Sequence, residues 1–352
     1  MKEVTKKLII KDNDNYNEDK LRRYHLPIIK SVNQLLSMIS FTSEDERKFF
    51  YSNNRKTFLY REITVPKRNG NGLRTIEIPD PKVKEIQQVL NKYIFSKFRM
   101  ANSCHGFVKN KSILTNALPH VGAKTLMKFD IKDFFPSITL NLVVQQLRFF
   151  GYGINVSKYI GYLCVNKDFC LPQGGPTSPY ISNLICINID KRIEGYCKKY
   201  NYKYTRYADD ITISSKEYIS DYKYEKTKEF IKKVLDDEKK LYSFKLNEEK
   251  CHKFVNGQKM IVTGIVINSK ATVNKSVYRE LDNAIRYIKL FGVNNHIEHL
   301  ELDYDVFSYK QHLYGLAYFV NMVNPERAKI YLNELNSLNF EEESRGDSRW
   351  QD

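Results

Sequence analysis

The sequence predicts an α+β fold, because three regions of the chain follow different hydrophobic periods. Residues 21–60 carry apolar side chains such as Leu35 and Ile39 at helical spacing. Residues 61–268 mix short alternating stretches, which are typical of strands, with helical ones. Beyond Ser269 the period is helical and stays so. Helices at both ends and a strand-rich middle favour an α+β domain.

The composition favours a polyanionic partner and gives no sign of a membrane protein. The 352 residues include 57 Lys and Arg against 41 Asp and Glu, a net charge of +16. Such an excess attracts nucleic acids and makes their binding salt-dependent, although charge alone does not establish the partner. No apolar run approaches the roughly 18 residues of a spanning helix. The six cysteines form no CxxC pair, so we expect reduced thiols in a cytoplasmic protein.

In the first half of the chain, the pattern predicts a hairpin, a helix and a buried strand. Residues 61–79 alternate between apolar and polar side chains around the basic, glycine-rich stretch 67–72, as in a hairpin. Apolar residues at helical spacing over 83–94 indicate an amphipathic helix. The segment Leu126–Ile131, in which four of six residues are apolar, predicts a strand, and Val143 lies at the start of the next helix.

In the second half, a tight turn at 171–176 precedes a long predicted helix that contains Leu184 and Ile193. Residues 204–214 indicate a second hairpin, and Ile261–Ile267 a further strand. Three apolar stripes then predict three packed helices. The stripes are Leu281, Ile285 and Ile288; Leu313, Leu316, Ala317 and Val320; and Ala328, Tyr331, Leu332 and Leu335.

Three carboxylates stand in apolar surroundings, where an uncompensated charge would be costly. Asp130 follows Phe129 in the predicted strand, and Asp209 and Asp210 lie at the bend of the second hairpin. Neighbouring carboxylates repel one another, and burial penalises their charged form unless a cation compensates. Oxygen ligands suit Mg²⁺, and two such ions can activate a 3′-hydroxyl and stabilise a departing pyrophosphate. Because an Asp-Asp pair alone more often forms a turn, the hypothesis depends on the motifs around it.

These motifs resemble those of the reverse transcriptases, in the same order along the chain. Tyr207-Ala208-Asp209-Asp210 is similar to the catalytic hairpin of that family, and the segment Phe129–Ile138 is similar to its first palm motif. Residues 171–179, Leu-Pro-Gln-Gly-Gly-Pro-Thr-Ser-Pro, resemble the motif that supports the template–nucleotide pair. The resemblance covers roughly residues 60–270 and implies an RNA-directed DNA polymerase that uses two Mg²⁺ ions. The metal ligands that it implies are Asp130, Ile131, Asp209 and Asp210.

The resemblance also implies roles for residues around the carboxylates. Phe135 stands at the steric-gate position of the family, where a ring would clash with a ribose 2′-hydroxyl and favour dNTPs. Lys67 and Arg74 correspond to fingertip cations that would clamp the triphosphate. Lys250 is a candidate general acid near the leaving pyrophosphate, which completes a catalytic set with Asp130, Asp209 and Asp210. The implied nucleotide-binding residues are Lys67, Arg74, Ile131, Asp133, Phe134, Phe135 and Gln173.

Two further segments resemble the retron branch of bacterial reverse transcriptases. The segment Asn116–His120 is similar to the Asn-Ala-x-x-His of these enzymes, and Val262-Thr263-Gly264 to their Val-Thr-Gly. Residues 313–325 are similar to a retron thumb, whereas Gly175 departs from the Ala that is common in the branch. The RNA- or primer-binding residues that this resemblance implies are Asn116, His120, Tyr207, Val262, Thr263 and Gly264.

Reverse transcriptases have the right-hand polymerase fold, with fingers, a palm of antiparallel sheet packed on helices, and here a helical thumb. The limits that we predict are a flexible lead-in at 1–20, fingers at 21–115, a palm at 116–268, an RNA-recognising thumb at 269–340 and a polar tail at 341–352.

For a retron enzyme, the resemblance implies that part of a cognate noncoding RNA is copied into branched RNA–DNA (msDNA) from a guanosine 2′-hydroxyl. It implies dNTPs as substrates, a role in anti-phage defence and a separate effector protein. The sequence leaves open a group II intron-like or an abortive-infection reverse transcriptase. A non-catalytic RNA-binding relative is a further alternative, against which the intact carboxylates argue.

Overall fold

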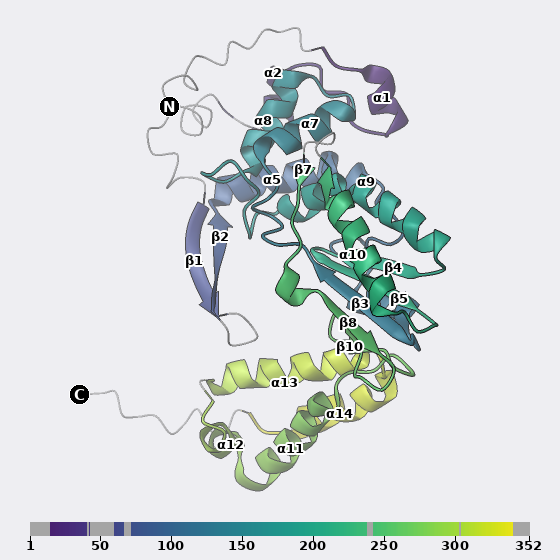
Figure 1. Cartoon of the computed structure of the whole chain (residues 1–352). Coiled ribbons are helices and arrows are strands. Elements are labelled where there is room, and N and C mark those ends of the chain that lie inside the picture. The colour runs from purple at the N-terminus through teal and green to yellow at the C-terminus, as the bar shows by residue number, and fades with distance from the viewer. Residues whose placement is uncertain are drawn as a thin grey trace, which may run out of the picture. The chain divides into compact units, whose positions relative to one another are not determined.

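The structure is a computed structural model that describes residues 15–40, 42, 60–66, 72–237, 242–302 and 304–340. The predicted tail and residues 1–14 of the predicted lead-in lie outside this set. The chain forms two compact units. Unit 1 comprises residues 1–110, 127–213 and 219–253, and unit 2 comprises residues 111–126, 214–218 and 254–352. Each unit has its own hydrophobic core, and Figure 1 labels many of the helices and strands.

Five of the α-helices that the structure describes in unit 1 begin at side-chain caps. Asn17, Ser31, Asp80, Thr139 and Ser220 each accept a hydrogen bond from a backbone N–H of the first turn, which satisfies a donor that the helix itself leaves unpaired. The helices are α1 (Glu18–Arg23), α2 (Val32–Met38), α5 (Pro81–Tyr93), α7 (Leu140–Phe149), α8 (Ile154–Cys164), α9 (Ser178–Lys199) and α10 (Asp221–Leu235), with 3₁₀ turns η2 (Phe95–Lys97) and η5 (Glu248–Lys250).

The first predicted helical region is interrupted. Leu35 is buried, as the pattern requires, but α1 ends before Pro27 and α2 begins after it. Proline lacks an amide hydrogen and disfavours the helical conformation in the residue before it. The helical prediction is therefore wrong over residues 24–31, and its part at 43–59 lies outside the described residues.

The largest sheet has the strand order β4-β5-β3-β8. Its strands are β3 (Thr125–Asp130), β4 (Lys203–Tyr207), β5 (Asp210–Ser215) and β8 (His252–Val255). A separate antiparallel ribbon joins β1 (Tyr60–Pro66) to β2 (Leu73–Pro79), with Ile63 opposite Ile76. This pairing confirms the first predicted hairpin, whose tip at 67–71 is not described. A short pair, β6 (Asp236–Asp237) and β7 (Tyr242–Ser243), follows α10.

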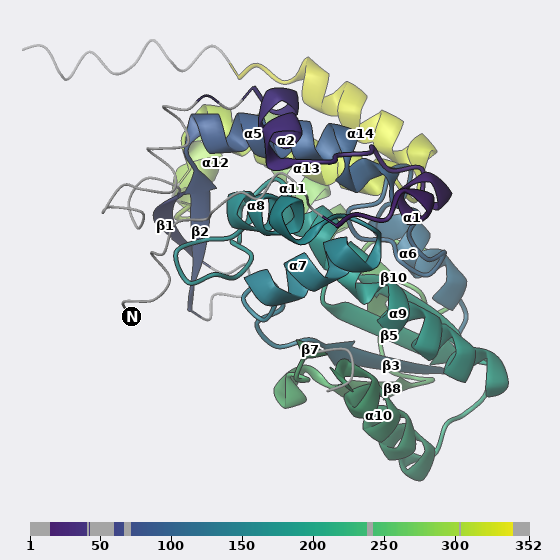
Figure 2. The same cartoon turned by 90° about the horizontal axis from the view of Figure 1, so that it is seen from above.

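The alternation of side chains along these strands separates the core from the face that carries the carboxylates. Phe129 and Ile211 are buried in the core of unit 1, and successive residues on a strand point to opposite faces. Asp130 and Asp210, each one residue away, therefore point to the other face. On the core face, Phe129 stacks on Tyr224 of α10 with ring centres 5.8 Å apart. Figure 2 shows α9 and α10 beside the sheet.

Unit 2 is mainly helical. Its elements are α6 (Ile113–Ala117), η3 (Leu118–His120), β9 (Ile261–Val262), β10 (Ile265–Val266), α11 (Lys275–Phe291), α12 (Val293–His299), α13 (Val306–Asn321) and α14 (Pro325–Ser337). The three predicted apolar stripes form its core: Leu281, Leu313 and Leu335 are all fully buried. Their burial confirms the three packed helices. None of the described helices is long and apolar enough to cross a membrane.

The predicted strand at Ile261–Ile267 is two strands. β9 and β10 pair antiparallel, with Val262 opposite Ile265, so the chain reverses between them. Thr263 and Gly264 make this reversal with φ angles of +45° and +88°. Glycine adopts such angles freely and threonine rarely does, and the reversal corrects the prediction of one continuous strand.

Candidate active site

The sheet brings the three predicted carboxylates together. Asp130 ends β3, and Asp209 and Asp210 stand at the bend between β4 and β5, the strand that lies next to β3. The amide of Ile131 donates to the carbonyl of Asp209 at 3.1 Å, which ties the two segments directly to one another. Asp130 is 6% exposed and the other two carboxylates are half-buried.

The electrostatics of this group are those of crowded negative charges. Burial, with the charges of Asp130 and Asp210, raises the pKa of Asp209 to about 6. Burial also raises the pKa of Asp210. The Lys250 ammonium donates to both carboxylate oxygens of Asp130 at 3.0 Å. Burial alone would lower the pKa of Lys250, but this contact with Asp130 raises it. The site therefore attracts cations, and a lysine side chain already occupies one flank.

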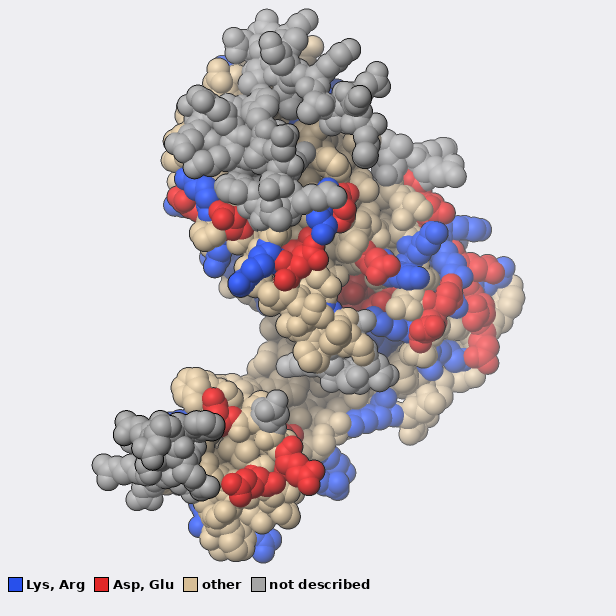
Figure 3. All heavy atoms as spheres, turned by 90° about the vertical axis from the view of Figure 1, so that its left-hand side faces the viewer, with Lys and Arg blue, Asp and Glu red and all other residues tan. Residues whose placement is uncertain are grey.

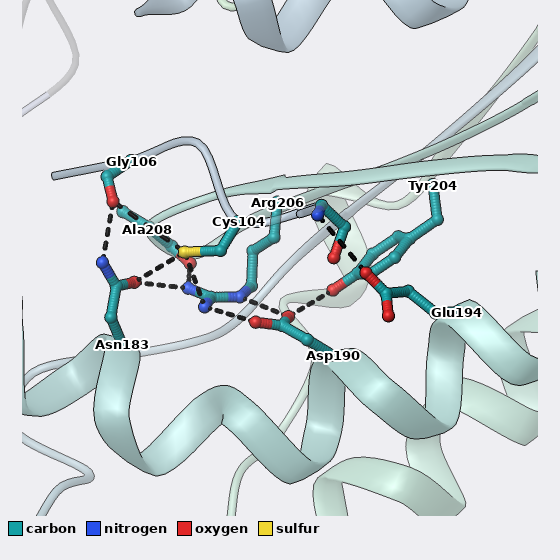
Figure 4. Close-up of polar contacts among 9 residues, drawn as sticks. Cys104, Gly106, Asn183, Asp190, Glu194, Tyr204, Arg206 and Ala208 are labelled. Atoms are coloured by element: carbon teal, nitrogen blue, oxygen red, sulfur yellow. Dashed lines mark hydrogen bonds and ion pairs between the residues drawn. The ribbon is translucent and has the colours of Figure 1, made fainter. Parts of the chain in front are cut away.

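A buried arginine supports the bend (Figure 4). Arg206, on β4, is fully buried, and its Nε and Nη2 donate to the two carboxylate oxygens of Asp190 on α9 at 2.7 and 2.8 Å. The planar guanidinium matches a carboxylate in such a fork. Burial disfavours its charge, but the Asp190 carboxylate keeps the pKa of Arg206 above its usual value. The Tyr204 hydroxyl donates to the same carboxylate at 2.7 Å.

The same guanidinium holds the main chain just before the carboxylates. Its Nη1 donates to the carbonyl of Ala208 at 2.9 Å and to the Asn183 side chain at 3.1 Å. Asn183 in turn donates to the carbonyl of Gly106 at 2.8 Å. A Cβ on Gly106 would lie 2.5 Å from the Ala208 amide nitrogen, so only glycine fits there. Ala208 has a φ of +56°, which is unusual for this residue type, and these contacts surround it.

Sequence reasoning missed this network, although one signal was available. Arg206 shares a strand face with Tyr204, and both are buried. A cation on the inward face of a strand requires a buried partner, because an unpaired charge there is very costly. The partner, Asp190, lies in the apolar part of the long helix and could have been sought there.

Phe135, the predicted steric gate, belongs to a row of rings. Its ring centre lies 6.4 Å from that of Phe107, which lies 6.3 Å from that of Tyr207. Phe107 is 43% exposed and has a φ of +59°. Sequence reasoning did not single out Phe107. On the other side, Phe134 is buried in the core and contacts Phe135.

The remaining predicted nucleotide contacts lie on separate segments of the chain. In the tight turn, the Gln173 carbonyl accepts from the Glu77 amide at 2.8 Å, so the turn is attached to β2. Arg74 is on the same strand with an exposed side chain, and Asp133 is exposed with a φ of +47°. Lys67 lies outside the described residues.

Comparison with known proteins agrees with this geometry. Residues 65–286 match the family model described as reverse transcriptase (RNA-dependent DNA polymerase). The retron Ec86 reverse transcriptase of Escherichia coli is 33% identical over 83% of this chain and 88% of its own length. The chain belongs to the retron reverse transcriptases. The retron Mx65 reverse transcriptase of Myxococcus xanthus is 30% identical over 89% of this chain and 73% of its own length.

Among solved structures, telomerase from Candida albicans in complex with an RNA fragment matches 87% of this chain and 68% of that chain. The sequence identity is 10% and the TM-score 0.43, too low to decide the fold. Family membership does decide it. This retron reverse transcriptase is an RNA-directed DNA polymerase with the right-hand polymerase fold, and an RNA template and dNTPs are its substrates.

Reverse transcriptases generally use a divalent metal, and the donors of this site fit one. Carboxylate oxygens are the ligands that Mg²⁺ prefers, and three of them meet around the bend. Within the described residues, no three His, Cys, Asp or Glu side chains are already arranged around one point. In this structure the Lys250 ammonium bonds both oxygens of Asp130, one of the carboxylates that a metal would share.

The retron-like segments meet within unit 2 of the enzyme. The Asn116 side chain donates to Thr263 Oγ1 at 3.3 Å, and Thr263 Oγ1 donates to the carbonyl of Ile113 at 2.9 Å. His120 Nδ1 lies 2.7 Å from Ser214 Oγ. Asn116, His120 and Val262 are fully buried, so their side chains pack inside the unit. Gly264, in the same turn, is exposed.

Proposed function

We propose that this retron reverse transcriptase transfers nucleotides with two Mg²⁺ ions held by Asp130, Asp209, Asp210 and the carbonyl of Ile131. The observation that carries the proposal is the bond between the Ile131 amide and the Asp209 carbonyl, which joins the end of β3 to the bend. The raised pKa of Asp209 supports it, because a site that disfavours its own negative charge gains most from a bound cation. When bound, the ions would activate the primer hydroxyl and stabilise the leaving pyrophosphate.

The side chains around the carboxylates would each act on one part of the nucleotide. Lys67 and Arg74 would hold the triphosphate, and the ring of Phe135 would exclude a 2′-hydroxyl. Lys250, whose ammonium is charged at neutral pH, would protonate the leaving pyrophosphate. The other contacts that we assign to the nucleotide are Ile131, Asp133, Phe134 and Gln173.

The finer function that we propose is that of a retron. The enzyme would copy part of its own noncoding RNA into msDNA, starting from a guanosine 2′-hydroxyl, in the cytoplasm and in anti-phage defence with a separate effector protein. The similarity to curated retron enzymes supports this. The fingers, palm and thumb would have the limits 21–115, 116–268 and 269–340.

Recognition of the RNA would use side chains that solvent can reach. Tyr207, Thr263 and Gly264 are partly or fully exposed, so we assign them to direct contact with RNA or primer. The buried Asn116 and His120 would act indirectly, by fixing the segment that ends in the exposed turn. Val262, also buried, would fix that turn from within the hydrophobic core.

The nucleic acid that co-purifies with the protein tests the proposal. We expect a branched RNA–DNA species that shortens on treatment with a 2′–5′ debranching enzyme, and whose DNA strand matches a noncoding RNA encoded nearby. A matched preparation of Asp210→Asn should contain the RNA without DNA. DNA of random sequence would instead indicate an abortive-infection type of enzyme, and unbranched cDNA would rule out priming from a 2′-hydroxyl.

A further inference from the structure

A cavity in unit 1 is lined by several basic side chains. It has a volume of about 380 Å³ and lies between the end of α1, the segment after η2, the end of α7 and the middle of α9. Arg23, Lys97, Arg99 and Lys191 line it, and no Asp or Glu is among the described residues of its lining. The face in Figure 3 differs, because there blue and red side chains are interspersed. The cavity is therefore a local concentration of positive charge.

These four cations have no ion-pair partner among the described residues, and all four are exposed. Two of their chain neighbours do have partners: Arg22 pairs with Glu18 and Arg192 pairs with Asp237. Like charges gathered without counter-charges repel one another, which costs stability unless an anion joins them. The arrangement points to an anionic ligand.

Aromatic rings form the other part of the lining. Phe150 is buried and fixed by edge-on contacts with Tyr24 and Phe98, at 4.8 and 4.5 Å between ring centres. It also meets Phe149 edge-on at 5.3 Å, and Phe149 itself is 52% exposed. A rigid cluster thus presents one exposed ring beside the cations. A simple phosphate or sulfate would make no use of it, whereas a nucleobase stacks on such a ring.

We propose that this cavity binds a nucleotide, with its base against Phe149 and its phosphate, or the phosphates on either side of it in a chain, on the four cations. The volume falls within the range of about 300–1,000 Å³ that is usual for ligand sites. No residue of the catalytic group lines it. On α9, Lys191 directly follows Asp190, which points instead to Arg206. The site would therefore bind nucleic acid that is not in the polymerase cleft, such as an unpaired loop of an RNA whose other part serves as template.

The test measures binding with the cleft already filled. The full-length protein is saturated with an unlabelled primer–template duplex, and a fluorescein-labelled 12-mer of riboadenosine is titrated by anisotropy at several salt concentrations. We expect Lys97→Glu/Lys191→Glu to weaken binding at least ten-fold. Its slope of log affinity against log salt should fall by about 1.4, since each lost phosphate contact in a single strand removes about 0.7.

The matched control is Lys223→Glu/Lys233→Glu, which makes the same charge change at two exposed lysines of α10. Its affinity should stay within two-fold of wild type. Phe149→Ala changes no charge and should weaken binding by about 5-fold or more through lost stacking. Melting curves of all variants show whether each is folded, and incorporation of dTTP on the preloaded duplex reports the polymerase separately.

Three results would each overturn the proposal. They are an equal loss of affinity in the two double-lysine variants, no binding of the 12-mer once the cleft is filled, and unchanged affinity in Phe149→Ala. If polyglutamate displaced the labelled 12-mer as effectively as unlabelled oligonucleotide does, the proposal would be overturned too, because the site would then recognise only negative charge. AMP distinguishes the source of the nucleotide. If AMP displaces the 12-mer, and if the same variants lose AMP binding, the site accepts free nucleotides. If only the 12-mer binds, the site requires an RNA chain.

Discussion

Replacing Arg206 by leucine should separate the stability of the palm from the geometry of its bend. The substitution leaves Asp190, which is 1% exposed, as a buried carboxylate without its cation. Breaking such a pair by removing one partner costs about 3–5 kcal/mol. The surface pair Arg192–Asp237, also from α9, provides the control, and Arg192→Leu should cost less than about 1 kcal/mol.

The double variant Arg206→Leu/Asp190→Leu carries the decisive comparison. With both charges gone, the double variant should be more stable than Arg206→Leu alone, although the Tyr204 hydroxyl and the Ala208 carbonyl each still lack a partner, at about 1–3 kcal/mol per group. DNA synthesis should not return, because the Ala208 carbonyl still lacks the donor that holds it before the carboxylates.

Urea unfolding gives the free energies, and incorporation rates on a short primer–template, titrated with Mg²⁺, give the activity. If the double variant regained both stability and rate, the network would be only a core contact. If Arg206→Leu alone cost no more than the surface control, the pair would not be the buried one that we describe.

Three further outcomes follow from the carboxylates and the ring beside them. Asp209→Ala or Asp210→Ala should abolish DNA synthesis while RNA binding persists in a filter-binding assay, and synthesis near the wild-type rate would refute their role. Phe135→Ala should raise ribonucleotide incorporation, so unchanged dNTP/NTP selectivity would remove Phe135 from the gate. Since the folded pKa of Asp209 is raised from 3.8 to about 6, its ionisation destabilises the metal-free fold increasingly as pH rises from about 4 to about 6, and by a constant amount above that. In EDTA, Asp209→Asn should therefore raise the melting temperature at pH 8 and by less at pH 5; an equal gain at both would contradict the cause.

The spacing of apolar residues predicted those strands and helices whose apolar side chains are the buried ones. The burial of Phe129 beside Asp130 and of Ile211 beside Asp210 follows from strand alternation, which is why the carboxylate face could be expected from sequence. Helices α11, α13 and α14 of unit 2 were equally clear, since each carries a long apolar stripe.

The spacing of apolar residues could not predict local backbone geometry or contacts between residues far apart in the sequence. Apolar residues continue through Pro27, so the break between α1 and α2 had to be read from one residue. Thr263 reverses the chain with a φ of +45°, an angle that threonine rarely adopts and that no apolar period reports. Arg206 and Asp190 are 16 residues apart along the chain, and their pairing depends on how α9 lies against β4.

Unit 2 is assembled from residues 111–126, 214–218 and 254–352, and this interleaving limits how the chain can be cut and recombined. A chimera that exchanges only the residues from 254 onward would take Thr263 from one enzyme and Asn116 from the other. The two residues would then have to form their hydrogen bond across the junction of two different sequences. Exchanging all three segments should transfer RNA preference between relatives more cleanly than exchanging the last alone. On the ribosome, likewise, Asn116 emerges long before Thr263, so this unit can close only after its third segment has been made.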